Sequence, residues 1–220
     1  RSDGGGALAG LRMAVNLSAH QLTTEAVIGQ VSQALAESGL PAACLELEIT
    51  ESVAMKKPEV TIDNLRALRQ IGVELAIDDF GTGYSSLAYL KLFPLNRLKL
   101  DRAFVKDIET DPSDADICDV TVLLAHKMGL EVIAEGVETE AQLKFLLSIG
   151  CEKIQGYLIS EPLPADQAPP LLARALRALG QQPPAELADG TLREVLAWGI
   201  AHWDASRIPR SRTLAEAQLR

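Results

Sequence analysis

Six times along the chain, a short apolar run of strand type is followed by a segment whose apolar residues recur at helical spacing. The strands are expected at residues 11–17, 44–50, 75–77, 97–101, 131–135 and 153–157, and the helices at 24–38, 58–72, 86–92, 114–128, 139–149 and 165–179. Repeated strand-then-helix units predict a parallel sheet with helices outside it. We therefore expect an α/β fold.

Each predicted strand has a polar side chain at or just after its carboxyl end. These side chains are Asn16, Glu48, Asp78, Asp79, Lys99, Glu135 and Gln155. Because parallel strands present their carboxyl ends on one side, these groups would converge at one mouth, as in the active site of a (β/α)₈ barrel. Any one of them could be an ordinary hydrogen-bonded strand end, but their recurrence on six strands favours a functional site.

Asp78 and Asp79 follow the apolar run 75–77 and precede a loop with two glycines. Neighbouring carboxylates raise each other's pKa, so keeping both ionised requires a bound metal or paired cations. Oxygen ligands favour Mg²⁺, Mn²⁺ or Ca²⁺. The alternative is that the pair only opens a turn, with Asp79 facing water and Asp78 capping a backbone amide.

The strand-end set offers enough oxygen ligands for two hard cations, one carboxylate bridging them: Asn16, Glu48, Asp78, Asp79 and Glu135. Two cations about 4 Å apart can activate water and stabilise the leaving oxygen when a phosphodiester is attacked. Lys99 could orient that water or offset phosphate charge, or form only a structural salt bridge. The three histidines lie away from the strand ends, which argues against a histidine-based mechanism.

Net charge, hydropathy and cysteine content exclude several classes of ligand, location and cysteine site. The net charge of −9 and the pI of about 4.9 argue against binding a nucleic-acid polymer or lying on anionic lipid. No apolar run approaches the ~20 residues that span a bilayer, and the first residues lack signal-peptide features, so we expect a cytoplasmic protein. Three widely spaced cysteines predict reduced thiols rather than disulfides or a zinc site.

Short motifs in this order resemble the EAL-domain phosphodiesterases, which hydrolyse the bacterial second messenger cyclic di-GMP. The matching segments cover about residues 11–173 and are Val15-Asn16-Leu17-Ser18, Glu48-Ile49-Thr50-Glu51-Ser52, Asp78-Asp79-Phe80-Gly81-Thr82-Gly83-Tyr84-Ser85-Ser86-Leu87, Leu98-Lys99-Leu100-Asp101, Ala134-Glu135-Gly136-Val137-Glu138-Thr139 and Gln155-Gly156-Tyr157-Leu158. The resemblance implies a TIM-like barrel that opens cyclic di-GMP to linear pGpG with Mg²⁺ or Mn²⁺.

The resemblance also implies roles for individual residues. The metal shell would be Asn16, Glu48, Asp78, Asp79 and Glu135. Lys99 and Gln155 would lie around the attacking water and the second metal. Glu51 would anchor the glycine loop Phe80, Gly81, Thr82, Gly83, Tyr84, Ser85 and Ser86, which in such proteins contributes to a dimer interface. Glu138 would support the site from behind the ligands.

One family feature is absent. The Glu-Ala-Leu signature, whose glutamate is also a metal ligand, does not occur in the sequence, and six units are visible where a closed barrel has eight. We expect the missing first one or two β/α units upstream of Arg1, in a longer protein with possible sensory or regulatory domains. In a truly truncated chain, an open barrel edge and a lost ligand would reduce stability and catalysis.

The domain boundaries follow from composition. Residues 1–10 are glycine-rich and predict a loop or frayed end, and residues 11–180 would form the barrel. In residues 181–220, a Gln-Gln-Pro-Pro linker precedes an amphipathic helix with the apolar stripe Leu192, Val195, Leu196, Ile200 and Trp203, and then a polar tail. The stripe would pack on the barrel or contact a partner.

The first functional hypothesis is a metal-dependent cyclic di-GMP phosphodiesterase that acts as a homodimer. The alternatives are a cyclic di-GMP receptor without catalytic activity, suggested by the absent signature, and a barrel hydrolase for a different phosphoester.

Overall fold

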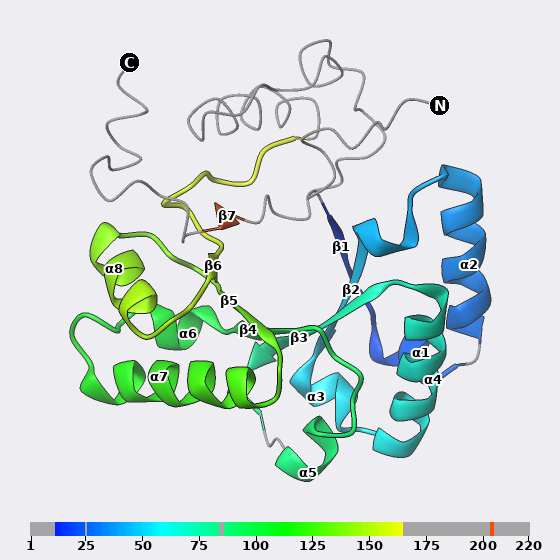
Figure 1. The fold of residues 1–220 in the computed structure, drawn as a ribbon, viewed down its shortest axis with the longest axis horizontal. Helices are drawn as coiled ribbons and strands as arrows, with labels where there is room; N and C mark the ends of the chain where they lie inside the picture. Colours follow the sequence, from blue (N-terminus) through cyan, green and yellow to red (C-terminus); the bar gives the residue numbers. More distant parts are fainter. Residues whose placement is uncertain (1–11, 25, 84–85, 165–202, 205–220) are drawn as a thin grey trace.

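The computed structural model describes residues 12–24, 26–83, 86–164 and 203–204. Six parallel strands run in chain order across one curved sheet, with each strand beside the next (Figure 1). They are β1 (Met13–Asn16), β2 (Leu45–Thr50), β3 (Glu74–Phe80), β4 (Arg97–Leu100), β5 (Glu131–Ala134) and β6 (Lys153–Ile154). This arrangement is a half-barrel, which confirms the expected α/β class and the parallel order of the strands.

Helices cover the outer side of this half-barrel (Figure 1). They are α1 (Ala19–Leu22), α2 (Ala26–Ser38), the 3₁₀ turn η2 (Ala42–Cys44), α3 (Glu51–Ala54), α4 (Pro58–Ile71), α5 (Leu87–Leu90), α6 (Arg102–Val105), α7 (Pro112–Lys127) and α8 (Glu140–Ser148). No helix among the described residues is long and apolar enough to cross a bilayer.

Helix α4 shows how sequence signals set the element boundaries. Pro58 occupies the first turn, where its missing N–H is not needed, and Gly72 ends the helix with φ 103°. Between them Ile62, Leu65 and Leu68 are buried against the sheet, as their spacing predicted.

Three short helices were not predicted, and each follows a strand directly: α1 after β1, α3 after β2 and α6 after β4. One turn is too short to show an apolar period, and only α1 and α6 begin with a side-chain cap that could have indicated them. Ser18 accepts from the Gln21 N–H ahead of α1, and Asp101 accepts from the Ala103 N–H ahead of α6.

The core lies between the sheet and the helices. Strand β2 illustrates the division: Leu47 and Ile49 point outward into this apolar core, whereas the alternate residues Glu46 and Glu48 share the other, inner face. Nearly all of β2 is buried, so Glu46 and Glu48 on its inner face are shielded from bulk water.

The C-terminal segment corrects one prediction. Trp203–Asp204 form β7, which pairs antiparallel with β6, so the expected helix does not extend to Trp203. The physical reason is that an edge strand such as β6 has unpaired backbone groups, which a further strand can satisfy. The other residues of the predicted stripe, the helix at 165–179, the linker and residues 1–10 lie outside the described residues.

The three cysteines differ in burial. Cys118 and Cys151 are buried, Cys44 is half-buried, and all three are free.

Candidate functional site

The predicted strand-end groups converge around one buried ammonium group. Lys99, on β4, is 3% exposed, and its Nζ lies 2.9 Å from Glu48 Oε1, 3.1 Å from Asp78 Oδ1 and 2.6 Å from Glu135 Oε1. These three carboxylates come from β2, β3 and the end of β5. One lysine therefore ties together groups that are far apart in the sequence, as expected for the carboxyl ends of neighbouring parallel strands.

The protonation equilibria at this cluster reflect burial and mutual charge. Burial raises the pKa of Glu135 to about 7 and also raises the pKa of Glu48, in each case against the opposing effect of Lys99. Burial alone would lower the pKa of Lys99, but Glu135, Glu48 and Asp78 outweigh it and raise that pKa. The cluster holds more carboxylate groups than ammonium groups, so it favours a further cation.

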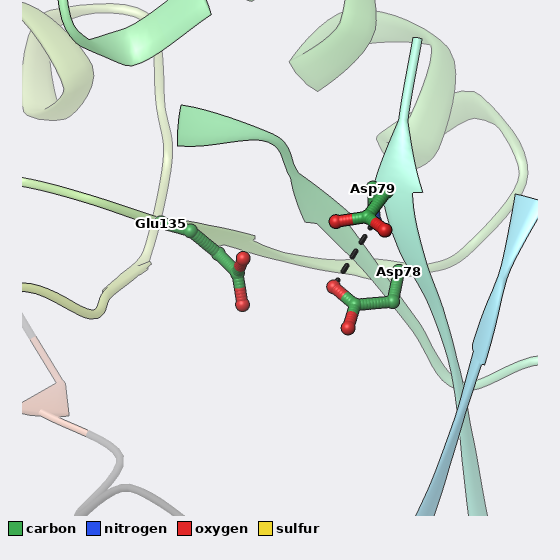
Figure 2. Close-up of side chains that lie close together, drawn as sticks. All are labelled: Asp78, Asp79 and Glu135. Carbon is green, nitrogen blue, oxygen red and sulfur yellow. Dashed lines mark hydrogen bonds between the residues drawn. The ribbon is translucent and has the colours of Figure 1, made fainter. Parts of the chain in front are cut away.

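Asp78, Asp79 and Glu135 are the group best placed to bind that cation. Each can offer one carboxylate oxygen such that the three oxygens lie within 4.8 Å of one another (Figure 2). Three hard oxygen donors at this spacing suit Mg²⁺, Mn²⁺ or Ca²⁺. The residues present thus fit the metal that the sequence predicted.

The backbone at the end of β3 brings both aspartates to this position. Asp79 has φ 54°, a left-handed conformation that is uncommon outside glycine, and its N–H donates to Asp78 Oδ1 at 3.0 Å. The register between β3 and β4 shifts between Ile77 and Phe80. This irregularity lets two consecutive side chains face the same site, whereas a regular strand would send them to opposite faces.

Asp101 is a neighbour of the site that sequence reasoning did not single out. Burial raises the pKa of Asp79, and the nearby carboxylates of Asp78 and Asp101 raise it further. Asp101 follows Lys99 by two residues, so strand alternation was the signal that could have placed it on the same face.

The glycine loop is tied to Glu51. This glutamate is 1% exposed and its Oε2 accepts from the Gly81 N–H at 2.9 Å. A Cβ at Gly83 would lie 3.0 Å from Glu51 Oε1, so the loop backbone passes close to the carboxylate. These contacts join Glu51 to the described part of the loop, while Tyr84 and Ser85 lie outside the described residues.

The remaining predicted residues differ in how closely they join the cluster. Asn16 pairs with Glu48 across β1 and β2 and is exposed. Gln155 has a buried Oε1 with no hydrogen-bond partner among the described residues, and such an orphaned acceptor suits a ligand. Glu138 is exposed, and the structure shows a bond of its backbone N–H to Gln142 Oε1 but no ion pair of its carboxylate within the described ranges.

Comparison with known proteins gives one consistent family. Residues 2–162 match the model of the EAL domain family. The Cyclic di-GMP phosphodiesterase NbdA of Pseudomonas aeruginosa is 47% identical over 173 residues, a match that covers 73% of this chain and 22% of NbdA. The chain spans about a fifth of the length of the curated relatives it matches.

Solved structures agree in fold. The PaMucR phosphodiesterase in complex with c-di-GMP matches with a TM-score of 0.69 and 44% identity over 71% of this chain and 64% of that one. The manganese and cyclic di-GMP complex of Klebsiella pneumoniae BlrP1 matches with a TM-score of 0.66 and 34% identity over 70% of this chain and 40% of that one. The charged, carboxylate-rich mouth described above therefore lies in a half-barrel of known type.

Proposed function

Because the chain belongs to the EAL domain family, we propose that it hydrolyses cyclic di-GMP to linear 5'-pGpG with the help of divalent metal. The observation that carries the proposal is the convergence of Glu48, Asp78 and Glu135 on Lys99, with Asp79 beside them. Similarity to NbdA and to the c-di-GMP complex of PaMucR supports the choice of substrate.

In this proposal Asp78, Asp79 and Glu135 hold Mg²⁺ or Mn²⁺, with Asn16 and Glu48 completing the shell of a two-metal site. Bound divalent cations would activate water and stabilise the leaving oxygen of the phosphodiester. The orphaned Oε1 of Gln155 provides a further acceptor at the mouth, for that water or the second metal.

Lys99 has a separate part in the proposal. Its ammonium is held by three carboxylates at 2.6 to 3.1 Å. If those carboxylates held metal, the N–H groups of Lys99 would be available to donate to a phosphate oxygen or to orient the water. Glu51 would keep the glycine loop in place, and Glu138 would support the site from outside it.

The proposal extends to the setting of the reaction. We infer a homodimer, a cytoplasmic location and upstream sensory or regulatory domains in a longer protein, in line with the family resemblance and with the small share of each curated relative that the chain covers.

The test is production of linear pGpG from cyclic di-GMP, with Mg²⁺ or Mn²⁺, followed by chromatography. We expect turnover in the wild type and a loss of at least 100-fold in Asp78→Asn, which keeps the size of the side chain but removes a ligand charge. Asp116→Asn is the matched control, because Asp116 is exposed on α7 and far from the strand ends in sequence.

Other outcomes would point to the other hypotheses. Tight binding of cyclic di-GMP without pGpG would identify a receptor. Cleavage of an aryl phosphodiester but not of cyclic di-GMP would identify a different phosphoesterase. Unchanged turnover in Asp78→Asn would contradict the metal assignment.

A further inference from the structure

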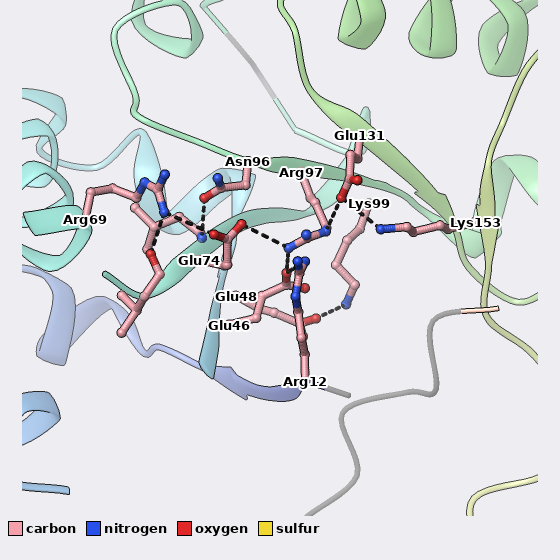
Figure 3. A network of polar contacts seen from close by, with 12 residues as sticks. Arg12, Glu46, Glu48, Arg69, Glu74, Asn96, Arg97, Lys99, Glu131 and Lys153 are labelled. Atoms are coloured by element: carbon pink, nitrogen blue, oxygen red, sulfur yellow. Dashed lines mark hydrogen bonds and ion pairs between the residues drawn. The ribbon is translucent and has the colours of Figure 1, made fainter. Parts of the chain in front are cut away.

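A second layer of charged residues lies beneath the site, toward the amino ends of the same strands. At its centre Arg97, on β4, is 1% exposed. Its guanidinium contacts Glu46 on β2, and lies 3.5 Å from Glu74 Oε2 on β3 and 2.7 Å from Glu131 Oε2 on β5 (Figure 3). Sequence reasoning missed this layer because it considered only the carboxyl ends of the strands.

The two layers have the same plan. Lys99 joins β2, β3 and β5 through Glu48, Asp78 and Glu135. Arg97 precedes Lys99 by two residues on the same strand face and joins the same three strands from below. Every strand that supplies a carboxylate to Lys99 is thus also held by Arg97.

Arg97 is suited to this task by its shape. A planar guanidinium can address several carboxylates in fixed directions, which a single ammonium does less rigidly. Neighbouring cations bind the outer parts of the layer: Arg12 lies 3.9 Å from Glu46, and Lys153 lies 2.9 Å from Glu131. Arg97 alone among these cations contacts three of the strands within the described residues.

Stability is a weak explanation for such a group. Burying a guanidinium and its carboxylates costs desolvation free energy, and apolar residues of similar volume often stabilise a protein equally well. If Arg97 fixes the relative positions of the strands, this role explains why the chain keeps a buried charged group despite its desolvation free energy.

Resting on the proposed function, we propose that Arg97 is a positioning residue: it clamps β2, β3 and β5 from beneath so that Glu48, Asp78 and Glu135 converge on Lys99 and on the metal. It does not touch substrate or metal itself. Its effect is transmitted through the strands that carry the ligands.

The proposal predicts the direction of a change in metal affinity. Arg97→Met removes a positive charge near the site, which by charge alone would tighten Mn²⁺ binding. If Arg97 positions the ligands, the affinity instead falls. We expect Mn²⁺, titrated without substrate, to bind Arg97→Met at least tenfold more weakly than the wild type.

Arg69→Met is the matched control. Arg69 belongs to the same network, but it contacts only Glu74, the first residue of β3, and Val73, the residue before it. Its Nη1 lies 2.7 Å from the Val73 carbonyl oxygen and 3.4 Å from Glu74 Oε1. The Arg69→Met variant loses the same charge but keeps the contacts of Arg97 with β2, β3 and β5. Its Mn²⁺ affinity should therefore stay within twofold of that of the wild type.

The double variant Glu46→Gln with Arg97→Met separates the clamp from simple charge imbalance. The double variant removes the charge of Glu46, the buried carboxylate that loses its Arg97 partner in Arg97→Met. It therefore also covers the case in which Arg97→Met alone does not fold. Under the proposal Mn²⁺ binding stays weak in the double variant. Recovery to the level of Arg69→Met would overturn the clamp.

The ammonium resonance of Lys99 gives a readout that needs neither metal nor substrate. We expect its NMR signal to be shifted or lost through exchange in metal-free Arg97→Met and preserved in Arg69→Met. Equal Lys99 signals and equal Mn²⁺ affinities in the two variants would overturn the proposal. A wild type that makes no pGpG would refute the proposed function, while a Lys99 signal lost only without Arg97 would still support the clamp.

Discussion

Lys99 shows how one residue can balance a site that is otherwise strongly negative. Its ammonium forms ion pairs with Glu48, Asp78 and Glu135, and two of these carboxylates, those of Asp78 and Glu135, also belong to the group that could bind a metal. The pKa of both groups is raised: burial raises that of Glu135 although Lys99 opposes it, and the surrounding carboxylates raise that of Lys99 although burial opposes it. Binding a divalent cation would therefore rearrange existing ion pairs rather than occupy a vacant apolar space.

The buried thiols give a prediction at the same scale. Burial raises the pKa of Cys118 and of Cys151 to about 12, from an ordinary value of 9.0. Between these values the unfolded chain has lost the thiol protons that the folded chain keeps, so the free energy of unfolding falls as pH rises. The loss is at most about 1.4 kcal/mol per thiol for each pH unit.

Chemical denaturation at pH 8 and pH 10 measures this loss. The variant with Cys118→Ala and Cys151→Ala should lose less stability between the two pH values than the wild type. Iodoacetamide at pH 8 should label Cys44 alone of the three cysteines in the native state. Equal pH slopes in both proteins would contradict the assigned cause.

At the scale of elements, the ends of strands decide the site. The end of β3 departs from regular pleating at Asp79, and the following loop is held by Glu51. Close backbone approaches recur at the end of β6, where a Cβ on Gly156 would lie 2.1 Å from the Val137 carbonyl oxygen and 2.3 Å from its nitrogen. Only glycine fits there, since backbone atoms cannot move aside.

The surroundings of Gly156 and Gly29 predict opposite effects of a glycine-to-alanine substitution on the free energy of unfolding. Gly156→Ala should lower the free energy of unfolding by about 3 kcal/mol or more, because the methyl group meets backbone. Gly29 is the exposed fourth residue of α2, and a Cβ there would have nothing within 4 Å, so Gly29→Ala should raise the free energy of unfolding by about 0.5 to 1 kcal/mol. Urea titrations measure both, and a tolerated Gly156→Ala would contradict the close approach.

At the scale of the whole molecule, curvature brings six strand ends to one mouth and places two charged layers inside the half-barrel (Figures 1 and 3). Metal binding should therefore be coupled to the stability of the entire sheet, because its ligands come from separate strands. A ligand that binds only the folded state adds about 2.7 kcal/mol at a concentration of 100 times its Kd.

Thermal unfolding with and without Mn²⁺ tests this coupling. We expect Mn²⁺ to raise the Tm of the wild type by several degrees, EDTA to reverse the increase, and Asp78→Asn to abolish the Mn²⁺-dependent part whatever its own Tm. The same Mn²⁺-dependent increase in Asp78→Asn would show that the metal binds elsewhere.

The sequence by itself determined the parallel order of the strands, most helix boundaries, and which polar residues stand at the strand ends. These features depend on local spacing, as in Ile62, Leu65 and Leu68 of α4, or on side chains that recur at strand ends. The match to the EAL domain family covers residues 2–162, the range in which these motifs lie.

Tertiary structure alone decided which charges meet. The three partners of Arg97, the left-handed Asp79 beside Asp101, and the pairing of β7 with β6 all depend on register and curvature between segments distant in sequence. A helical stripe ending at Trp203 could not anticipate that the edge of β6 offers backbone hydrogen bonds. Local spacing in the sequence specifies which residues share a face of a helix or strand. The distances between side chains on different elements are set only when those elements pack together.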